Sequence, residues 1–254
     1  MKANTFWIST VPRTGSMWLY NTTREILKIS KFNVLPNQIP QQDKEFYEIF
    51  NKESLLDKNN FNKYTFKVHN ILKPEFPKSK ILTTLRDPRE ICLSFKEFMK
   101  TDFNSAFTAA KNITKFEKEY KNYDKNYLRF FRYENIEKKP IETILDIADF
   151  INCKISIKDA ENISIKYNKN SVRQLIKTNN EKLLQKIKSK EKINNAEIVY
   201  FSKDNFRSFD LNTGFQTNHV SNRVAGDWKN FFSQNEIELM NSEFKDFLEE
   251  YLYT

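Results

Sequence analysis

The chain has 254 residues, of which 39% are hydrophobic and 15% aromatic, enough to bury one sizeable core, and we expect one domain over residues 1–254. No apolar run approaches the roughly 20 residues of a membrane-spanning helix, and no signal-peptide pattern opens the chain, so we expect a cytoplasmic protein. An excess of 42 Lys+Arg over 33 Asp+Glu favours an anionic ligand without choosing among nucleotide, nucleic acid and membrane. Cys92 and Cys153 are expected to be buried free thiols, because they lack metal-ligand spacing.

Short apolar runs alternate with helical patterns along the chain, which predicts an α/β fold with a central, mostly parallel sheet flanked by helices. The expected strands are Thr5–Ser9, a weaker one at Asn33–Leu35, then Tyr64–Val68, Lys80–Leu85 and Leu128–Tyr133. The expected helices are Ser16 to about Lys28, Pro88–Met99, Asn104–Tyr120, Ile141–Ile151, two or three within Ile157–Lys192, and Gln234–Tyr251, with an extended loop over Phe201–Phe232.

Polar residues follow four of these strands. The first strand leads into Val11–Trp18, a turn that contains Gly15 and opens a helix, where backbone N–H groups can hold a phosphate. Lys67–His69, Arg86–Arg89 and Tyr133–Asn135 follow the other three. Because ligands of open α/β sheets bind outside the carboxyl ends of the strands, we expect a phosphate cradle, a titratable base and a cation at one edge.

The loop after the first strand is not a standard ATP-binding loop. That motif places a lysine and a magnesium-binding hydroxyl directly after its second glycine, whereas Gly15 is followed by Ser16, Met17 and Trp18. The chain has three glycines in all, Gly15, Gly214 and Gly226, so a glycine at this turn indicates a backbone requirement. An ATP- or GTP-dependent kinase is therefore disfavoured.

Two segments resemble motifs of the sulfotransferase superfamily. Pro12–Trp18, with the sequence Pro-Arg-Thr-Gly-Ser-Met-Trp, resembles the family's 5′-phosphosulfate loop, Pro-Lys/Arg-Ser-Gly-Ser/Thr-x-Trp. Arg86–Ser94 resembles its 3′-phosphate motif, Arg-Asn/Asp-Pro-x-Asp/Glu-x-x-x-Ser. The resemblance implies a P-loop-NTPase-like three-layer sandwich, 3′-phosphoadenosine 5′-phosphosulfate (PAPS) as co-substrate, 3′-phosphoadenosine 5′-phosphate (PAP) as product, and no metal.

A third segment matches the family only in part. Where the family has Arg-Lys-Gly-x-x-Gly-Asp-Trp-Lys, Ser221–Lys229 keeps Gly-Asp-Trp-Lys and lacks the preceding Arg-Lys-Gly. Either Arg223 reaches the 3′-phosphate from a shifted position, or Asn222 and backbone N–H groups suffice. Tyr133 resembles the family tyrosine near the adenine, and Trp18 is a second aromatic that can stack on that base.

The resemblance also implies roles for individual residues. His69, in a segment similar to the family's Lys-Thr-His, is the expected base, with Arg13 and Lys67 stabilising charge. Glu25 is a weaker candidate base, and His219 is either in a loop over the acceptor or exposed. The expected nucleotide-binding residues are Arg13, Thr14, Gly15, Ser16, Met17, Trp18, Arg86, Ser94, Tyr133, Asn222 and Arg223.

The acceptor cannot be identified from the sequence beyond a hydroxyl or amine on a small molecule, glycan or lipid. The segments expected to line its pocket are Leu35–Asn62, Asp102–Lys111 and Phe201–Val220. Two alternatives to a sulfotransferase remain at this stage: a P-loop-type nucleotide kinase, and a non-enzymatic module whose basic surface binds nucleic acid or anionic lipid. We expect no nucleic-acid partner and leave the oligomeric state open.

Overall fold

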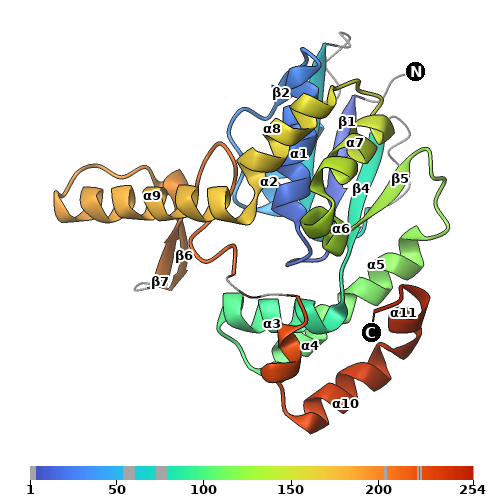
Figure 1. The fold of residues 1–254 in the computed structure, drawn as a ribbon. Helices are drawn as coiled ribbons and strands as arrows, with labels where there is room; N and C mark the ends of the chain where they lie inside the picture. The colour runs from blue at the N-terminus through green and yellow to red at the C-terminus, as the bar shows by residue number, and fades with distance from the viewer. Residues whose placement is uncertain are drawn as a thin grey trace.

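A central five-stranded parallel sheet organises the molecule (Figure 1). The computed structural model describes residues 4–53, 61–72, 79–202, 205–221, 223 and 225–253. The strand order is β2-β3-β1-β4-β5, which confirms the predicted α/β architecture. The strands are β1 (Thr5–Ser9), β2 (Asn33–Leu35), β3 (Asn62–Val68), β4 (Ser79–Leu85) and β5 (Leu128–Arg132). The last strand ends one residue before the prediction, because Tyr133 already begins a helix.

The strand β1 lies at the centre of the sheet, and all five of its residues are buried. It pairs in parallel with β3, where Ser9 is opposite Val68, and with β4, where Ile8 is opposite Leu82. A strand covered on both faces needs apolar residues on both, which explains the unbroken run Phe6-Trp-Ile8. This register brings the ends of β1, β3 and β4 to the same edge of the sheet.

Helices flank the sheet. The helices α1 (Ser16–Ile29), α7 (Pro140–Phe150) and α8 (Ile157–Tyr167) pack against one another beside it (Figure 1). The face that carries Trp7 is covered by α2 (Asp43–Glu53), whose Phe50 ring lies 5.2 Å from the Trp7 ring. The helix α2 was not predicted from the sequence, although Phe46 and Phe50 are one turn apart and Asp43 and Glu45 supply an acidic first turn.

A second group of helices lies beyond the carboxyl edge of the sheet (Figure 1). It comprises α3 (Pro88–Met99), α4 (Phe103–Ala110), α5 (Asn112–Tyr120), α10 (Gln234–Glu243) and α11 (Lys245–Glu250). The helix expected over Asn104–Tyr120 is therefore two helices. At their junction the Asn112 amide donates to the Ala109 carbonyl (3.2 Å) and the Thr114 hydroxyl donates to the Lys111 carbonyl (2.9 Å), bonds that compete with the helical backbone ladder. The closing helix is likewise divided, at the buried Phe244.

The long helix α9 (Lys169–Lys188) and the antiparallel hairpin of β6 (Ile198–Ser202) and β7 (Asn205–Ser208) project from the rest of the molecule (Figure 1). The hairpin was not predicted, and the extended loop expected over Phe201–Phe232 contains β7 and the short helix η2 (Asp227–Asn230). The remaining short helices are α6 (Tyr133–Lys138) and η1 (Asn195–Glu197). Cys92 and Cys153 are buried free thiols. Within the described ranges, no helix combines the length and apolarity needed to cross a bilayer.

Candidate active site

The turn between β1 and α1 is built around Gly15. Its φ of +93° lies in the left-handed region, and a Cβ atom placed there would come within 2.9 Å of the Tyr133 ring, so both conformation and space require glycine. Gly15 is the N-cap residue of α1 and no side chain caps the helix. The first N–H groups of α1 can therefore bind an anion.

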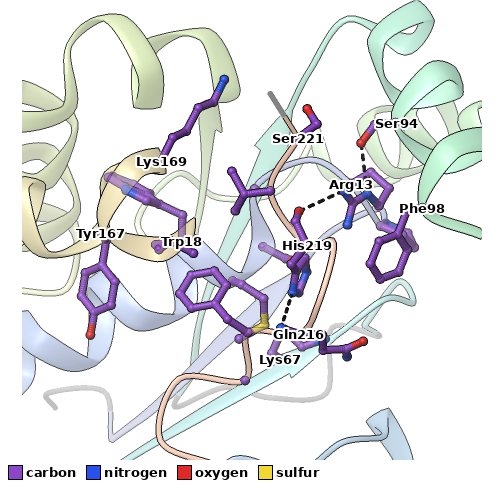
Figure 2. Close-up of a pocket in the computed structure, with 18 of the residues that line it drawn as sticks. Arg13, Trp18, Lys67, Ser94, Phe98, Tyr167, Lys169, Gln216, His219 and Ser221 are labelled. Atoms are coloured by element: carbon purple, nitrogen blue, oxygen red, sulfur yellow. Dashed lines mark hydrogen bonds between the residues drawn. The ribbon is translucent and has the colours of Figure 1, made fainter. Parts of the chain in front are cut away.

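A cavity of about 760 Å³ opens at this turn. Its lining residues include Arg13, Lys67, His69, Arg86 and Tyr133 at or beyond strand ends, with Ser16 and Trp18 from α1 and Ser94 from α3. Figure 2 shows Arg13, Trp18, Lys67 and Ser94 around this cavity. The glycine-bearing turn and the arginine that follows β4 thus face one space. These two elements can hold two phosphate groups of a single nucleotide in such a cavity.

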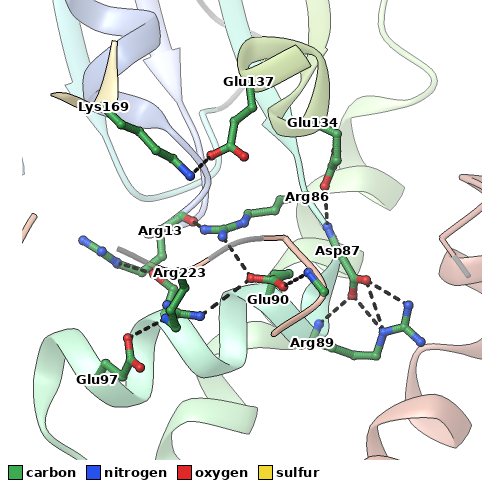
Figure 3. Close-up of polar contacts among 12 residues, drawn as sticks. Arg13, Arg86, Asp87, Arg89, Glu90, Glu97, Glu134, Glu137, Lys169 and Arg223 are labelled. Atoms are coloured by element: carbon green, nitrogen blue, oxygen red, sulfur yellow. Dashed lines mark hydrogen bonds and ion pairs between the residues drawn. The ribbon is translucent and has the colours of Figure 1, made fainter. Parts of the chain in front are cut away.

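Arg86 connects the turn after β1 to the turn after β4. Its Nη1 donates a 2.6 Å hydrogen bond to the carbonyl of Arg13, and its guanidinium lies 4.0 Å from the centre of the Tyr133 ring. Its Nη2 is 3.3 Å from Glu90 Oε2, one helical turn further on (Figure 3). These contacts fix a planar cation beside the Gly15 turn.

Arg13 extends from the same turn toward α3. Its Nε donates to the Ser94 hydroxyl (3.0 Å), its Nη2 donates to the His219 carbonyl (3.0 Å), and its guanidinium lies 4.1 Å from the centre of the Phe98 ring. Burial, followed by the charge of Arg86, lowers the pKa of Arg13 to about 9. The group therefore stays cationic at neutral pH and provides fixed positive charge.

His69 is held with one nitrogen available as a base. Its Nδ1 lies 2.9 Å from the Thr10 carbonyl, which can only accept, so Nδ1 carries the proton and Nε2 presents a lone pair. Lys67 Nζ donates to Nε2 over 3.1 Å. Burial, then the charge of Lys67, lowers the pKa of His69 to about 3, with Arg13 adding to the effect and the Thr10 bond opposing it. The imidazole is neutral at physiological pH.

Asp43 at the start of α2 supports this pair and was not predicted as a site residue. Its Oδ2 accepts the backbone N–H of His69 (2.6 Å), and its Oδ1 is 3.9 Å from Lys67 Nζ. Burial lowers the pKa of Lys67 and the Asp43 carboxylate opposes that shift. The only sequence signal was an acidic residue at a helix start, which by itself indicates capping.

Comparison with known proteins agrees with this geometry. The family model described as "Sulfotransferase domain" matches residues 3–251. The chain belongs to the sulfotransferase family. A sequence comparison with curated proteins gives no significant match.

Solved structures share the fold at low identity. A retinol dehydratase in complex with androsterone and the inactive cofactor PAP is 14% identical, with a TM-score of 0.62 over 98% of this chain and 81% of that chain. The mouse sulfotransferase SULT7A1 complexed with PAP is also 14% identical, with a TM-score of 0.61 over 97% of this chain and 84% of that chain. At identities this low, the structural similarity establishes the fold alone.

The side chains of the other residues in the turn between β1 and α1 point in different directions. Ser16, Met17 and Trp18 line the cavity. The Thr14 side chain is buried and bonded to the Val11 carbonyl (2.7 Å) and the Thr84 hydroxyl (2.5 Å), so a nucleotide contact from Thr14 would use its backbone. No cluster of three or more His, Cys, Asp or Glu side chains suited to a metal occurs within the described part of the chain.

In the incomplete C-terminal motif, Arg223 is held by carboxylates. Its Nε is 2.8 Å from Glu97 Oε2, and its Nη1 is 3.8 Å from Glu90 Oε2. Asn222 lies outside the described residues. The family sequence has two cations where this chain has Ser221 and Asn222. Among residues 221–223 Arg223 is the one positively charged side chain, and it is already paired.

Glu25 and His219 occupy different surroundings. Glu25 does not line the cavity and pairs with Lys166 (2.9 Å) and Lys28 (3.3 Å), which is evidence against its weaker candidacy as base. His219 lines the cavity, with its ring 5.6 Å from that of Phe98, and its Nδ1 accepts the Gln216 N–H (3.3 Å). Burial, then Arg13, lowers the pKa of His219 well below its usual value.

The acceptor side of the cavity corrects one sequence expectation. Within the expected segments, residues 39–41 and six residues between Phe209 and Val220 contribute to the wall, but no residue of Asp102–Lys111 does. The apolar side chains of α4 instead pack into the core, where Phe107 meets Phe244. Three apolar residues from the second half of α3 take that place: Phe95, Phe98 and Met99.

Proposed function

We propose that this sulfotransferase moves the sulfuryl group of PAPS to a hydroxyl or amine of an apolar small molecule by in-line displacement. One observation carries the proposal: the Gly15 turn and Arg86 are joined by a 2.6 Å hydrogen bond and line a single cavity. Two anion-binding elements at this separation suit a compound with phosphate groups at both its 5′ and 3′ positions. Both similar structures are complexes with PAP.

The residues present fit such a nucleotide. The turn over Arg13–Trp18 would hold the 5′-phosphosulfate through backbone N–H groups at the start of α1. Arg86 and Ser94 would hold the 3′-phosphate, and Tyr133 with Trp18 would contact the adenine. The co-substrate supplies an activated sulfuryl group, and the protein supplies its orientation and charge.

His69 would act as the base. As the acceptor oxygen or nitrogen forms its bond to sulfur, its proton passes to His69 Nε2, and the bond between sulfur and the bridging oxygen breaks with PAP as the leaving group. Lys67 now donates to Nε2, so in the reaction its ammonium must turn toward the transferred group. Arg13 adds fixed positive charge where the leaving oxygen becomes negative.

The acceptor wall favours an apolar compound with one reactive polar group. Ile39, Phe98, Phe209, Phe215 and Val220 line the cavity beside His69. A wall of this composition binds a flat hydrocarbon or aromatic skeleton better than a glycan, which would leave its hydroxyls without partners. Androsterone and retinol, which are present in complexes of similar structures, are compounds of this kind.

The test begins with calorimetric titration of PAP and of magnesium-ATP. We expect PAP to bind and ATP to bind far more weakly, and the reverse result would contradict the proposal. Arg86→Ala should weaken PAP binding by tenfold or more, whereas Arg129→Ala, at an exposed ion pair on β5, should not.

His69→Ala should abolish turnover in an acceptor screen with PAPS and leave PAP affinity within about twofold, because the imidazole would act on the acceptor. Retained turnover would remove His69 from the role of base. A screen in which apolar alcohols and phenols are inert while a glycan is sulfated would refute the acceptor class.

A further inference from the structure

The segment that supplies two cations in the family pattern has lost most of that charge here. Ser221, Asn222 and Arg223 stand where the family has Arg-Lys-Gly, and Arg223 lies between Glu97 and Glu90. A nucleotide with a 3′-phosphate still needs positive charge at this end of the cavity, because a phosphate dianion is costly to desolvate without cations. Arg86 provides one cation there, but its guanidinium is itself paired with Glu90.

A lysine from a different part of the chain faces this position. Lys169, the first residue of α9, lines the main cavity and also a small adjoining pocket whose other walls include Arg86, Tyr133, Ser221 and Arg223. Its place is fixed by Asn168, the N-cap residue of α9, whose side chain accepts the Ser171 N–H over 2.8 Å. Figure 3 shows the Lys169 side chain directed toward the group around Arg86.

Lys169 is paired with Glu137. Their Nζ and Oε1 atoms are 2.5 Å apart, and the Lys169 side chain keeps 36% of its surface exposed. Glu137 is on α6, one turn after Tyr133, whose ring stacks on Arg86. An ammonium group has three donors, so contact with one carboxylate oxygen leaves capacity for a phosphate.

We propose that Lys169 is a nucleotide-binding residue that contacts the 3′-phosphate and takes the place of the cations missing from residues 221–223. The inference rests on the proposed function, since it requires a nucleotide with a 3′-phosphate. Glu137 pairs with Lys169, and Glu90 pairs with Arg86. The dianion would compete with these carboxylates for both cations.

The experiment compares PAP with adenosine 5′-monophosphate, which lacks the 3′-phosphate, by calorimetric titration. Lys169→Gln keeps a hydrogen-bonding partner for Glu137 and removes the charge. We expect the Kd for PAP to rise about tenfold and the Kd for the monophosphate to change less than about twofold. The matched control is Lys177→Gln, on the same helix and paired with Glu181, which should alter neither.

Equal losses for both nucleotides, or no loss for PAP, would overturn the assignment of Lys169. If the unaltered protein does not bind PAP, the proposed function itself fails, so the two failures are distinguishable. A second variant is expected to have the opposite effect. Glu137→Gln frees the Lys169 charge and should lower the Kd for PAP about two- to fivefold, a gain in affinity that misfolding cannot produce. Weaker PAP binding in this variant would also count against the proposal.

Discussion

Folding of this sulfotransferase should become less favourable in mild acid because His69 is buried in its neutral form. The pKa of His69 is about 3 in the folded protein, through burial and the charge of Lys67, and about 6.5 in an unfolded chain. Between these values the unfolded state binds a proton that the folded state does not. Stability therefore falls as pH decreases through this window, and little is lost above it.

The size of the effect depends mainly on the unfolded-state pKa. At about pH 5 an unfolded imidazole is almost fully protonated and the folded one almost not at all, which lowers the free energy of unfolding by at most about 2 kcal/mol relative to about pH 7.5. Any folded-state pKa below about 4 gives nearly the same figure, so the result does not depend on the exact shift. Replacing His69 by asparagine, which retains an N–H for the Thr10 carbonyl, removes this contribution.

The assay is urea denaturation of the wild type and His69→Asn at about pH 7.5 and about pH 5. The relevant quantity is the stability lost on acidification, since the substitution also changes stability at neutral pH. We expect the variant to lose about 2 kcal/mol less than the wild type. His219→Asn should also reduce the loss, because burial lowers that pKa as well. Equal acid sensitivity in His69→Asn and the wild type would refute a neutral, buried His69.

Three further predictions concern the residues around His69 and the Gly15 turn. Gly15→Ala should destabilise the fold by about 1–2 kcal/mol more than the control Gly226→Ala in denaturant unfolding, since both sites have positive φ but only Gly15 has Tyr133 within 2.9 Å. Arg13→Lys should lower kcat about tenfold or more in steady-state assays, because one ammonium nitrogen does not reproduce the fixed Nε and Nη2 donors that bond Ser94 and the His219 carbonyl; unchanged kcat would mean that charge alone matters. Asp43→Asn removes the carboxylate that raises the pKa of Lys67, so the alkaline limb of the pH–kcat profile should move to lower pH, and a move to higher pH would contradict the pairing.

The sheet was predictable because its signals are local. The strand β1 is a short apolar run bounded by polar turns, and α3 begins with Pro88 after the capping residue Asp87, so both were predicted at their observed bounds. The missed elements depend on contacts distant in the sequence. The helix α2 is half exposed and gains its stability by covering Trp7, and the β6–β7 hairpin is a short two-stranded element beside α9.

The nucleotide side of the cavity was more predictable than the acceptor side. Gly15 and Arg86 follow strands, and parallel strands deliver such residues to one edge whatever else the fold contains. Asp43, Phe98 and Lys169 come from helices whose packing decides where their side chains point. No spacing rule in the sequence relates Lys169 to Arg86, although both line one pocket.

The incomplete C-terminal motif can be divided by what each half does in the fold. Gly226 adopts a φ of +97° and donates its N–H to Glu90 over 2.7 Å, while the buried Trp228 lies under the Arg89 guanidinium at 4.2 Å. These contacts, made by Gly226 and Trp228, fasten the C-terminal segment to α3. Residues 221–223 carry one charged side chain, Arg223, which is paired with Glu97 and Glu90, so further positive charge near Arg86 must come from elsewhere. A lysine on another helix can meet that need, because a phosphate responds to the position of a cation and not to its place in the sequence.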